Sequence, residues 1–115
     1  MSEYIEIHWS SGSIDEARKI SRYLVQERFV ASVQIVPWVE SIYLWNGRLE
    51  TTQESKVVMK TTKDRYDSVR KVIVDNTSYQ VPEITFVAIE GGNEEYLKWV
   101  DESVNSSAIE AGKGK

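Results

Sequence analysis

The sequence of 115 residues contains no cysteine, one histidine and two prolines. Without cysteine, the chain can form no disulfide, no thiolate metal site and no cysteine nucleophile. A Ser-His-Asp triad would have to use His8, and no Gly-x-Ser-x-Gly elbow accompanies it. His8 lies mid-strand between Ile7 and Trp9, and we interpret it as a satisfied or surface histidine. These absences argue against catalysis by a cysteine or a Ser-His-Asp triad, and they leave open a pair of carboxylates acting as acid and base, of which the sequence gives no positive sign.

The chain also lacks a run of about 18 apolar residues and a basic start followed by an apolar segment. Its lysines and arginines form no cluster, and the formal net charge is −4. Binding to nucleic acid requires clustered positive charge, so nucleic acid is not an expected partner. With 41% apolar and 28% charged residues, the composition is that of a globular protein. We therefore expect a cytoplasmic protein that contacts neither membrane nor nucleic acid.

The spacing of apolar residues predicts four strands and three helices. The strands are expected over residues 4–10, 30–45, 48–61 and 84–90, and the helices over about 14–28, 62–76 and 94–104. The last strand is a continuous apolar run, which favours burial on both sides. The order predicts an α+β fold, a ferredoxin-like βαββαβ sandwich followed by a short C-terminal helix. We expect one domain over residues 1–104 and a flexible tail over 105–115.

Local signals mark several ends of these elements. Ser13 and Glu16 have the spacing of a capping box for the first helix. Thr61 with Asp64 is expected to cap the second helix, and Asn93 the third. Asn46-Gly47 is a type I′ turn signal, which joins the second and third strands into a hairpin.

This hairpin is too long for one small domain. Residues 31–45 would extend roughly 50 Å, whereas a compact chain of this length is only ~35 Å across. Beyond Pro37 both faces carry apolar side chains, and the expected oligomer contacts are Trp38, Ile42, Tyr43, Leu44 and Trp45. Another copy of the chain would cover them, so we predict a closed homo-oligomer. The alternative is that residues 38–50 fold back on their own sheet or cover a loop.

Four separated segments of the sequence are similar to those of a known protein family. The stretches "LVQERFVASVQIVPWVESIYLWNGRLE", "KVVMKTT", "YQVPEI" and "GGNEEYLKWVDESV" resemble, in order and spacing, the signature segments of the CutA divalent-ion tolerance family. The resemblance covers about residues 4–104. It implies a ferredoxin-like subunit in a tight homotrimer held by the long hairpin, with an architecture similar to the PII signalling proteins. It also implies a non-enzymatic role in tolerance of copper and other divalent metal ions.

The resemblance implies a cleft between subunits that binds an ion or a small ligand. Its positions in this chain are Lys60, Thr61, Tyr79, Pro82, Glu83 and Trp99, and Glu54 matches a recurrent acid. The chain departs from the family at Ser32, where cysteine is usual, at Thr77, where histidine is usual, and at Trp38, where glycine is common. Hydroxyl groups coordinate copper weakly, so we expect poor copper binding. Glu54, Glu83 and backbone oxygens could instead hold a hard divalent cation, which is the one cofactor that the sequence suggests.

Two other functions are open at this point. One is a PII-like signalling module that responds to a nucleotide or another anion and binds a partner protein, with Gly91-Gly92-Asn93 as a place for an anion. The other is a structural trimer that has lost its ligand together with the usual residues at positions 32 and 77.

Overall fold

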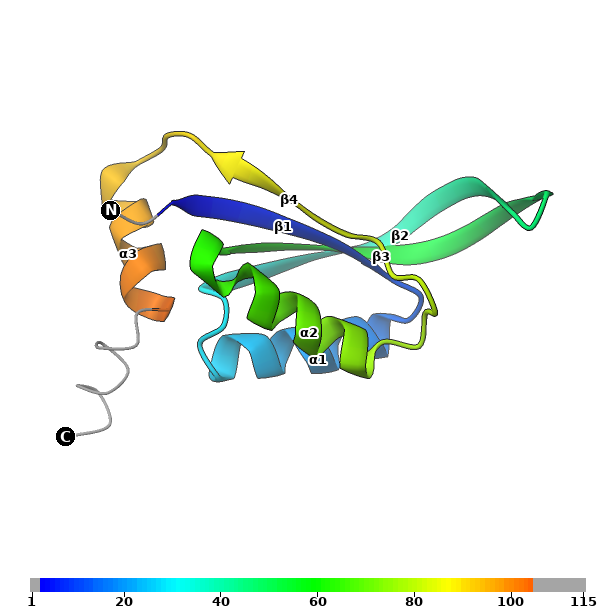
Figure 1. Cartoon of the computed structure of the whole chain (residues 1–115), viewed down its shortest axis with the longest axis horizontal. Coiled ribbons are helices and arrows are strands. Elements are labelled where there is room, and N and C mark those ends of the chain that lie inside the picture. Colours follow the sequence, from blue (N-terminus) through cyan, green and yellow to red (C-terminus); the bar gives the residue numbers. More distant parts are fainter. Residues whose placement is uncertain (1–2, 105–115) are drawn as a thin grey trace.

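The computed structural model describes residues 3–104. Its elements are β1 (Tyr4–Ser11), α1 (Ile14–Gln26), β2 (Ser32–Trp45), β3 (Arg48–Thr62), η1 (Lys63–Arg65), α2 (Tyr66–Asn76), β4 (Ile84–Ile89) and α3 (Glu94–Val104). The four strands form one antiparallel sheet in the order β2-β3-β1-β4. This arrangement confirms the predicted ferredoxin-like fold with an additional C-terminal helix (Figure 1). The tail predicted over 105–115 lies outside the described residues.

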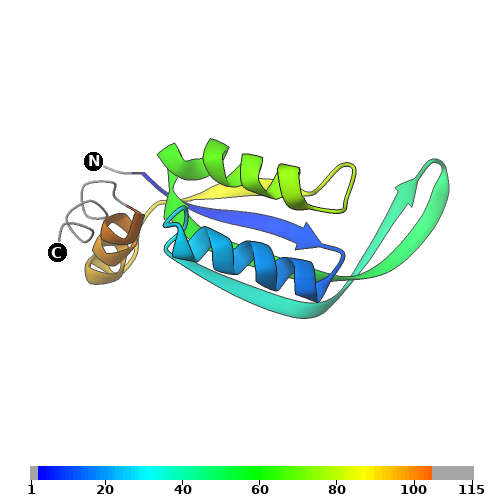
Figure 2. The ribbon, with the colours of Figure 1, turned by 90° about the horizontal axis from the view of Figure 1, so that it is seen from below.

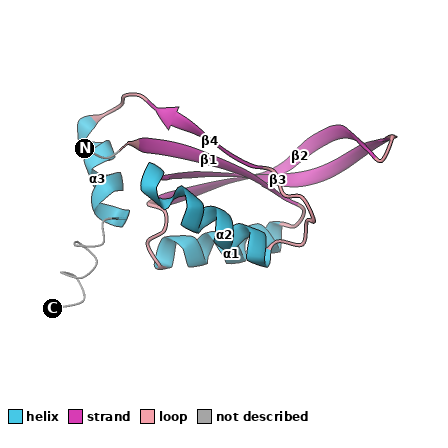
Figure 3. Cartoon of the chain, viewed as in Figure 1, coloured by secondary structure: helices cyan, strands magenta, loops and turns pink. Residues whose placement is uncertain are grey.

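The core lies between the sheet and one layer of helices. Both α1 and α2 cover the same face of the sheet, whereas α3 lies at the end near the N-terminus (Figures 2 and 3). Alternate residues of β1 point into this layer, and Ile5, Ile7 and Trp9 are fully buried against residues such as Leu24 and Ile73. Each such side chain contributes about 1.5–3 kcal/mol to folding. The alternation read from the sequence therefore identifies the covered face.

The opposite face of the sheet is not covered by α1 or α2, although α3 packs against Tyr4 at one end of it, and it carries charged groups. Glu6 lies at its centre, with His8 Nε2 2.7 Å from one carboxylate oxygen and Lys60 Nζ 3.2 Å from the other. Burial would raise the pKa of Glu6, but the hydrogen bonds and charges of Lys60 and His8 outweigh it and lower that pKa. His8 is thus satisfied by a neighbouring side chain.

The expectation that the last strand is buried on both sides is wrong for the single chain. β4 is an edge strand, and Phe86 and Val87 are both exposed. Only its helix-facing side is partly covered, where the ring of Phe86 lies 4.6 Å from that of Tyr66. A continuous apolar run does not distinguish burial within a chain from a face left open at the sheet edge.

The helix starts agree only partly with the predictions. Ser13 accepts a hydrogen bond from Glu16 N, as expected, but the Glu16 carboxylate bonds residues outside the helix and completes no capping box. Asn93 caps α3 by accepting from Glu95 N at 3.2 Å. Thr61 does not cap the second helix, because its side chain points into the core and donates to Phe29 O at 2.8 Å. One turn of 3₁₀-helix, η1, precedes α2 instead.

The β2–β3 hairpin extends beyond the rest of the sheet. β1 ends at Ser11 opposite Ser55, so the part of β3 before Ser55 pairs with β2 alone. The molecule is 53 × 29 × 22 Å, and its radius of gyration is 15.4 Å, compared with about 13 Å for a compact chain of this length. Positive φ angles at Asn46 and Gly47 fit the predicted type I′ turn.

The two faces of the projecting hairpin differ. Tyr43 and Trp45 share a face with Glu50, and this face looks towards the loop between α2 and β4. The other face carries Ile42, Leu44 and Leu49, which are 64%, 70% and 71% exposed. The chain covers one side of its own hairpin in part and leaves the second side open.

A β-bulge interrupts the hairpin at Pro37 and Trp38. The register shifts between Val36 and Val39, and Trp38 adopts a φ of +67°. This left-handed region costs a residue with a Cβ roughly 1–2 kcal/mol, and glycine occupies it freely. A glycine at position 38, which the resemblance leads us to expect, would adopt this conformation without strain.

Replacing Trp38 tests this backbone strain. Trp38→Gly and Trp38→Ala both remove the exposed indole, but only glycine removes the Cβ. We expect the glycine variant to be more stable than the alanine variant by about 1 kcal/mol, measured by denaturant unfolding. An alanine variant of equal or greater stability would show that residue 38 has an ordinary backbone conformation.

Candidate functional site

The loop from 77 to 83 packs against the base of the hairpin. It connects α2 to β4, and Tyr79 from this loop lies over Gly12 at the end of β1. A Cβ at Gly12 would lie 2.9 Å from the tyrosine ring, closer than any normal contact. Glycine at this position therefore allows the ring to lie against the sheet.

Glu16 holds the start of this loop. Its carboxylate accepts hydrogen bonds from Ser11 Oγ at 2.8 Å, Thr77 Oγ1 at 3.1 Å and Ser78 N at 2.8 Å. Burial alone would raise the pKa of Glu16, but these donors stabilise the charged form and hold the pKa below its ordinary value of 4.5. A helix residue thus fixes a loop that is 61 residues away in the sequence.

Tyr79 reaches from the loop to a buried acid on the hairpin. Its Oη donates to Glu54 Oε2 at 2.5 Å, and Glu54 is only 9% exposed. Burial, together with the hydrogen bond and negative charge of Glu54, raises the pKa of Tyr79 far above its usual value. The phenol therefore stays protonated and acts as a donor to the carboxylate at neutral pH.

A depression of about 790 Å³ lies beside this pair. Its lining combines carboxylates and aromatic rings, namely Glu50, Glu54, Glu83, Tyr43, Trp45 and Tyr79. Ser10 also lines it and donates to Glu83 Oε1 at 3.2 Å. The depression brings together Tyr79 and Glu83, which the resemblance implies for a ligand cleft, and Glu54, which matches a recurrent acid. It also contains three residues predicted to contact another subunit: Ile42, Tyr43 and Trp45.

The remaining expected ligand residues lie elsewhere in the chain. Lys60 is on the open face of the sheet, paired with Glu6. Thr61 is fully buried on the helix-covered face. Trp99 is half exposed on α3, where its ring lies 5.7 Å from that of Tyr96. One chain therefore does not bring these three side chains to the depression.

The donor groups do not fit a soft metal ion. Ser32 pairs in register with Lys60 at one end of β1, whereas Thr77 contacts Glu16 beside the other end. Both offer only neutral hydroxyls, which are weak ligands for a soft metal ion. Within residues 3–104, no group of three or more His, Cys, Asp or Glu side chains is placed to hold a metal. Copper coordination at these positions is not supported by the residues present.

The start of α3 is a poor site for an anion. Asn93 Oδ1 already accepts from Glu95 N, and Asn93 O accepts from Leu97 N. Glu94 and Glu95 add two negative charges in the first turn. These charges would repel a phosphate from the helix N-terminus, so the Gly91-Gly92-Asn93 segment serves as a turn and a cap.

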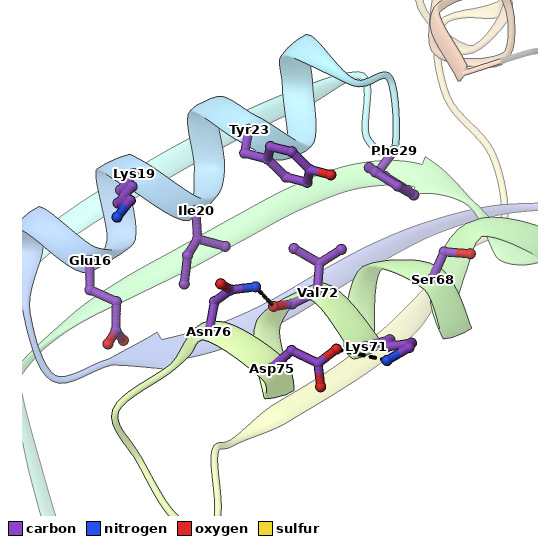
Figure 4. A pocket seen from close by; sticks show the side chains of 10 residues that line it. All are labelled: Glu16, Lys19, Ile20, Tyr23, Phe29, Ser68, Lys71, Val72, Asp75 and Asn76. Atoms are coloured by element: carbon purple, nitrogen blue, oxygen red, sulfur yellow. Dashed lines mark hydrogen bonds and ion pairs between the residues drawn. The ribbon is translucent and has the colours of Figure 1, made fainter.

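A second depression, of about 870 Å³, runs between α1 and α2 on the outer surface (Figure 4). Ile20 and Tyr23 from α1 face Val72 and Asn76 from α2 across it. Two of its charged groups pair with each other, since Lys71 Nζ lies 2.7 Å from Asp75 Oδ2. None of the predicted ligand residues lines this groove.

The sequence reasoning did not find Glu50, Ser10 or Gly12 as parts of the site. Glu16 was interpreted as a capping residue, and its contacts to the loop were missed. Ser10, Gly12 and Glu16 act on residues that are distant in sequence, so no local signal identifies them. The register of the hairpin, which places Tyr43 opposite Glu50, could have identified Glu50 from the Asn-Gly turn alone.

Comparison with known proteins gives a consistent result. A family profile described as CutA1 divalent ion tolerance protein matches residues 5–103. The chain is 40% identical to the divalent-cation tolerance protein CutA of Thermus thermophilus, over 79% of this chain and 88% of that protein. It is 32% identical to Protein CutA 1, chloroplastic, of Oryza sativa, over 81% of this chain and 52% of that protein. The chain thus spans about half the length of the rice relative.

Solved structures agree with the fold. The crystal structure of CutA1 from Oryza sativa has a TM-score of 0.89 at 28% identity, covering 91% of this chain and 96% of that chain. The structure titled periplasmic divalent cation tolerance protein CutA, from Archaeoglobus fulgidus, has a TM-score of 0.86 at 31% identity, covering 89% and 99%.

These names contradict the expected cytoplasmic location. One relative is described as chloroplastic and another as periplasmic. Targeting segments set the location of a protein, and the composition of a folded domain does not. The composition of this domain therefore does not predict its location. Between residues 3 and 104, no helix is both long and apolar enough to cross a membrane.

The pKa of Glu16 predicts a pH-dependent contribution to stability. Because this pKa is lower in the folded chain, the charged carboxylate stabilises the fold above the ordinary pKa, and this contribution is lost as pH falls through the folded pKa. Glu16→Gln should lower the free energy of unfolding by about 1 kcal/mol at pH 7. The difference from the wild type should shrink below about pH 4.5.

Denaturant unfolding between pH 3 and pH 7 measures this difference. Asp15→Asn is the control, since Asp15 is an exposed neighbour in the same helical turn. A Glu16→Gln variant whose pH profile matches that of the control would contradict the assigned role of Glu16.

Proposed function

This chain belongs to the CutA1 divalent ion tolerance family, and we propose that it serves divalent-ion tolerance as a non-enzymatic homotrimer that binds an ion or small ligand between its subunits. Divalent-ion tolerance is the role that gives the family its name. The trimer and its clefts are supported by two features of the chain itself.

The first feature is the uncovered face of the hairpin. Ile42, Leu44 and Leu49 are mostly exposed, and Trp38 is 71% exposed at the bulge. A two-stranded hairpin with an open apolar face is marginal in water and prone to aggregate. Neighbouring subunits that cover this face would remove the apolar surface from water.

The second feature, which supports a cleft between subunits, is that the expected ligand residues lie in two separate parts of the chain. Tyr79 and Glu83 lie at the base of the hairpin, near the C-terminal end of β1. Lys60 pairs with Glu6 nearer the N-terminal end of β1, and α3, with Trp99, packs beside Tyr4. The two groups would share one site only if they came from different subunits.

The ligand chemistry of this cleft differs from that implied for copper. Its groups are carboxylates, phenols and an ammonium, with no thiol, and the imidazole of His8 is engaged by Glu6. Oxygen ligands suit hard cations, and aromatic walls suit organic groups. The cleft therefore favours a hard or organic ligand over a soft metal ion.

Leu44→Glu tests the trimer. The substitution places a charge on the open face of the hairpin without changing Trp45, which lines the depression. We expect sedimentation at micromolar concentration to show dissociation to the monomer, because burying an unpaired carboxylate in an interface is unfavourable.

Ser68→Glu is the matched control, since it adds the same charge to an exposed position of α2 far from the hairpin. It should leave the trimer intact. Wild-type protein that sediments as a single 13.2 kDa particle, or a Leu44→Glu variant that remains trimeric, would contradict the proposed assembly.

Restoring soft ligands tests the cleft. Ser32→Cys with Thr77→His should raise the affinity for copper by at least about tenfold, or ~1.4 kcal/mol, measured by calorimetry under reducing conditions. Because one chain separates the two positions, the gain should disappear in the monomeric Leu44→Glu background. A gain that persists in the monomer, or no gain in the trimer, would place these residues outside a shared cleft.

A further inference from the structure

A third depression, of about 540 Å³, lies between α1 and the edge strand β2. Figure 2 shows α1 running along this strand, and the two elements are in contact. Val33 and Ile35 line the depression from β2. Four residues of α1 line it at the spacing of a single helix face, namely Arg18, Ser21, Arg22 and Val25. The depression therefore combines two cationic side chains with an apolar wall.

The two arginines of this depression have no counter-charge. Neither Arg18 nor Arg22 forms an ion pair within residues 3–104. No aspartate or glutamate lines the depression. Asp15 lies one helical turn before Arg18 and lines the neighbouring surface, but it forms no ion pair with either arginine. On a chain with a net charge of −4, this is a local pair of cations without a competing anion.

Ser21 lies between the two arginines and has an unsatisfied hydroxyl. The residue is only 4% exposed, and its Oγ has no hydrogen-bond partner among the described residues. Most buried polar groups in folded proteins are paired, because an unpaired one is unfavourable. A hydroxyl can donate one hydrogen bond to an acceptor that enters the depression. A ligand oxygen held between Arg18 and Arg22 would supply the missing partner.

These donors fit an anion that carries several oxygens. A guanidinium group donates in a planar fork that matches phosphate and carboxylate oxygens, and two such groups favour a doubly charged anion. A phosphate monoester has a charge of about −1.5 to −2 near neutral pH and three acceptor oxygens. The volume is within the range of small-molecule sites, and Val25, Val33 and Ile35 offer contacts to an organic group. The depression therefore favours an organic phosphate over inorganic phosphate.

We propose that the depression between α1 and β2 binds a small organic phosphate monoester. The phosphate group lies between Arg18 and Arg22 and accepts from Ser21, and the organic group packs against the apolar side chains of β2. This inference goes beyond the proposed function, because the depression shares only Ser32 with the positions assigned to the cleft between subunits.

Calorimetric titration of the full chain with phenyl phosphate tests the site. Phenyl phosphate should bind saturably and about tenfold more tightly than phenyl sulfate, which has a similar shape but only one negative charge. Inorganic phosphate should also bind more weakly than phenyl phosphate, because it has no group to contact the apolar wall. All titrations use the same ionic strength, since salt screens interactions between exposed charges.

Substitutions separate the roles of the arginines and the serine. Arg18→Gln and Arg22→Gln should each lower the affinity for phenyl phosphate about tenfold. Arg70→Gln, at an exposed position of α2, makes the same change in net charge and should leave the affinity unchanged. Ser21→Ala should lower the affinity about fivefold, and it should not lower the midpoint of denaturant unfolding, because the lost hydroxyl has no partner in the fold.

Absence of saturable binding by phenyl phosphate would overturn the proposal, and so would Arg18→Gln and Arg22→Gln variants that bind like the Arg70→Gln control. The Leu44→Glu variant separates this site from the cleft between subunits. Because the proposed site lies within one chain, this variant should bind phenyl phosphate as tightly as the wild type does. Binding that is lost in the Leu44→Glu variant would place the ligand between subunits and overturn a site within one chain.

Discussion

The antiparallel pairing of β2 with β3 is the constraint on which the rest of the structure depends. The ladder runs from Ser32 opposite Lys60 to Trp45 opposite Arg48, but β1 accompanies it only as far as Ser55. Within the sheet, the ladder supports the core between strands and helices. Beyond the sheet, it is a two-stranded ribbon, which is marginally stable in water by itself. The loop at 77–83 covers one face of the outer hairpin in part.

The bulge at Pro37 and Trp38 separates these two parts of the hairpin. Proline donates no ladder hydrogen bond, and the positive φ of Trp38 shifts the register of the strand beyond it. After the bulge, Tyr43 and Trp45 line the depression, Leu44 is mostly exposed on the other face, and Ile42, 64% exposed, also borders the depression. One strand thus contributes both to the depression and to the open face of the hairpin.

The charged groups of the chain are arranged differently at the two ends of the sheet. On the open face, Glu6 is balanced by Lys60 and by His8. At the hairpin base, Glu54 accepts from the neutral phenol of Tyr79, and Glu16 is held by hydroxyl and amide donors. The resemblance to related sequences placed Lys60 and Tyr79 in one cleft, but a single chain keeps them apart. A shared cleft therefore requires contributions from more than one chain.

The sequence alone determined the order of the elements, the hairpin turn at Asn46-Gly47, the Asn93 cap and the family, because these signals depend on residues close together in the chain. It did not determine the exposure of β4, the core position of Thr61, or the cellular location. Nor did it reveal that Glu16 would hold Ser78, 62 residues away, or that Tyr79 would bond Glu54, 25 residues away. Only the tertiary structure decided these contacts, because side chains that are distant in sequence meet only after the strands have paired and the helices have packed on the sheet.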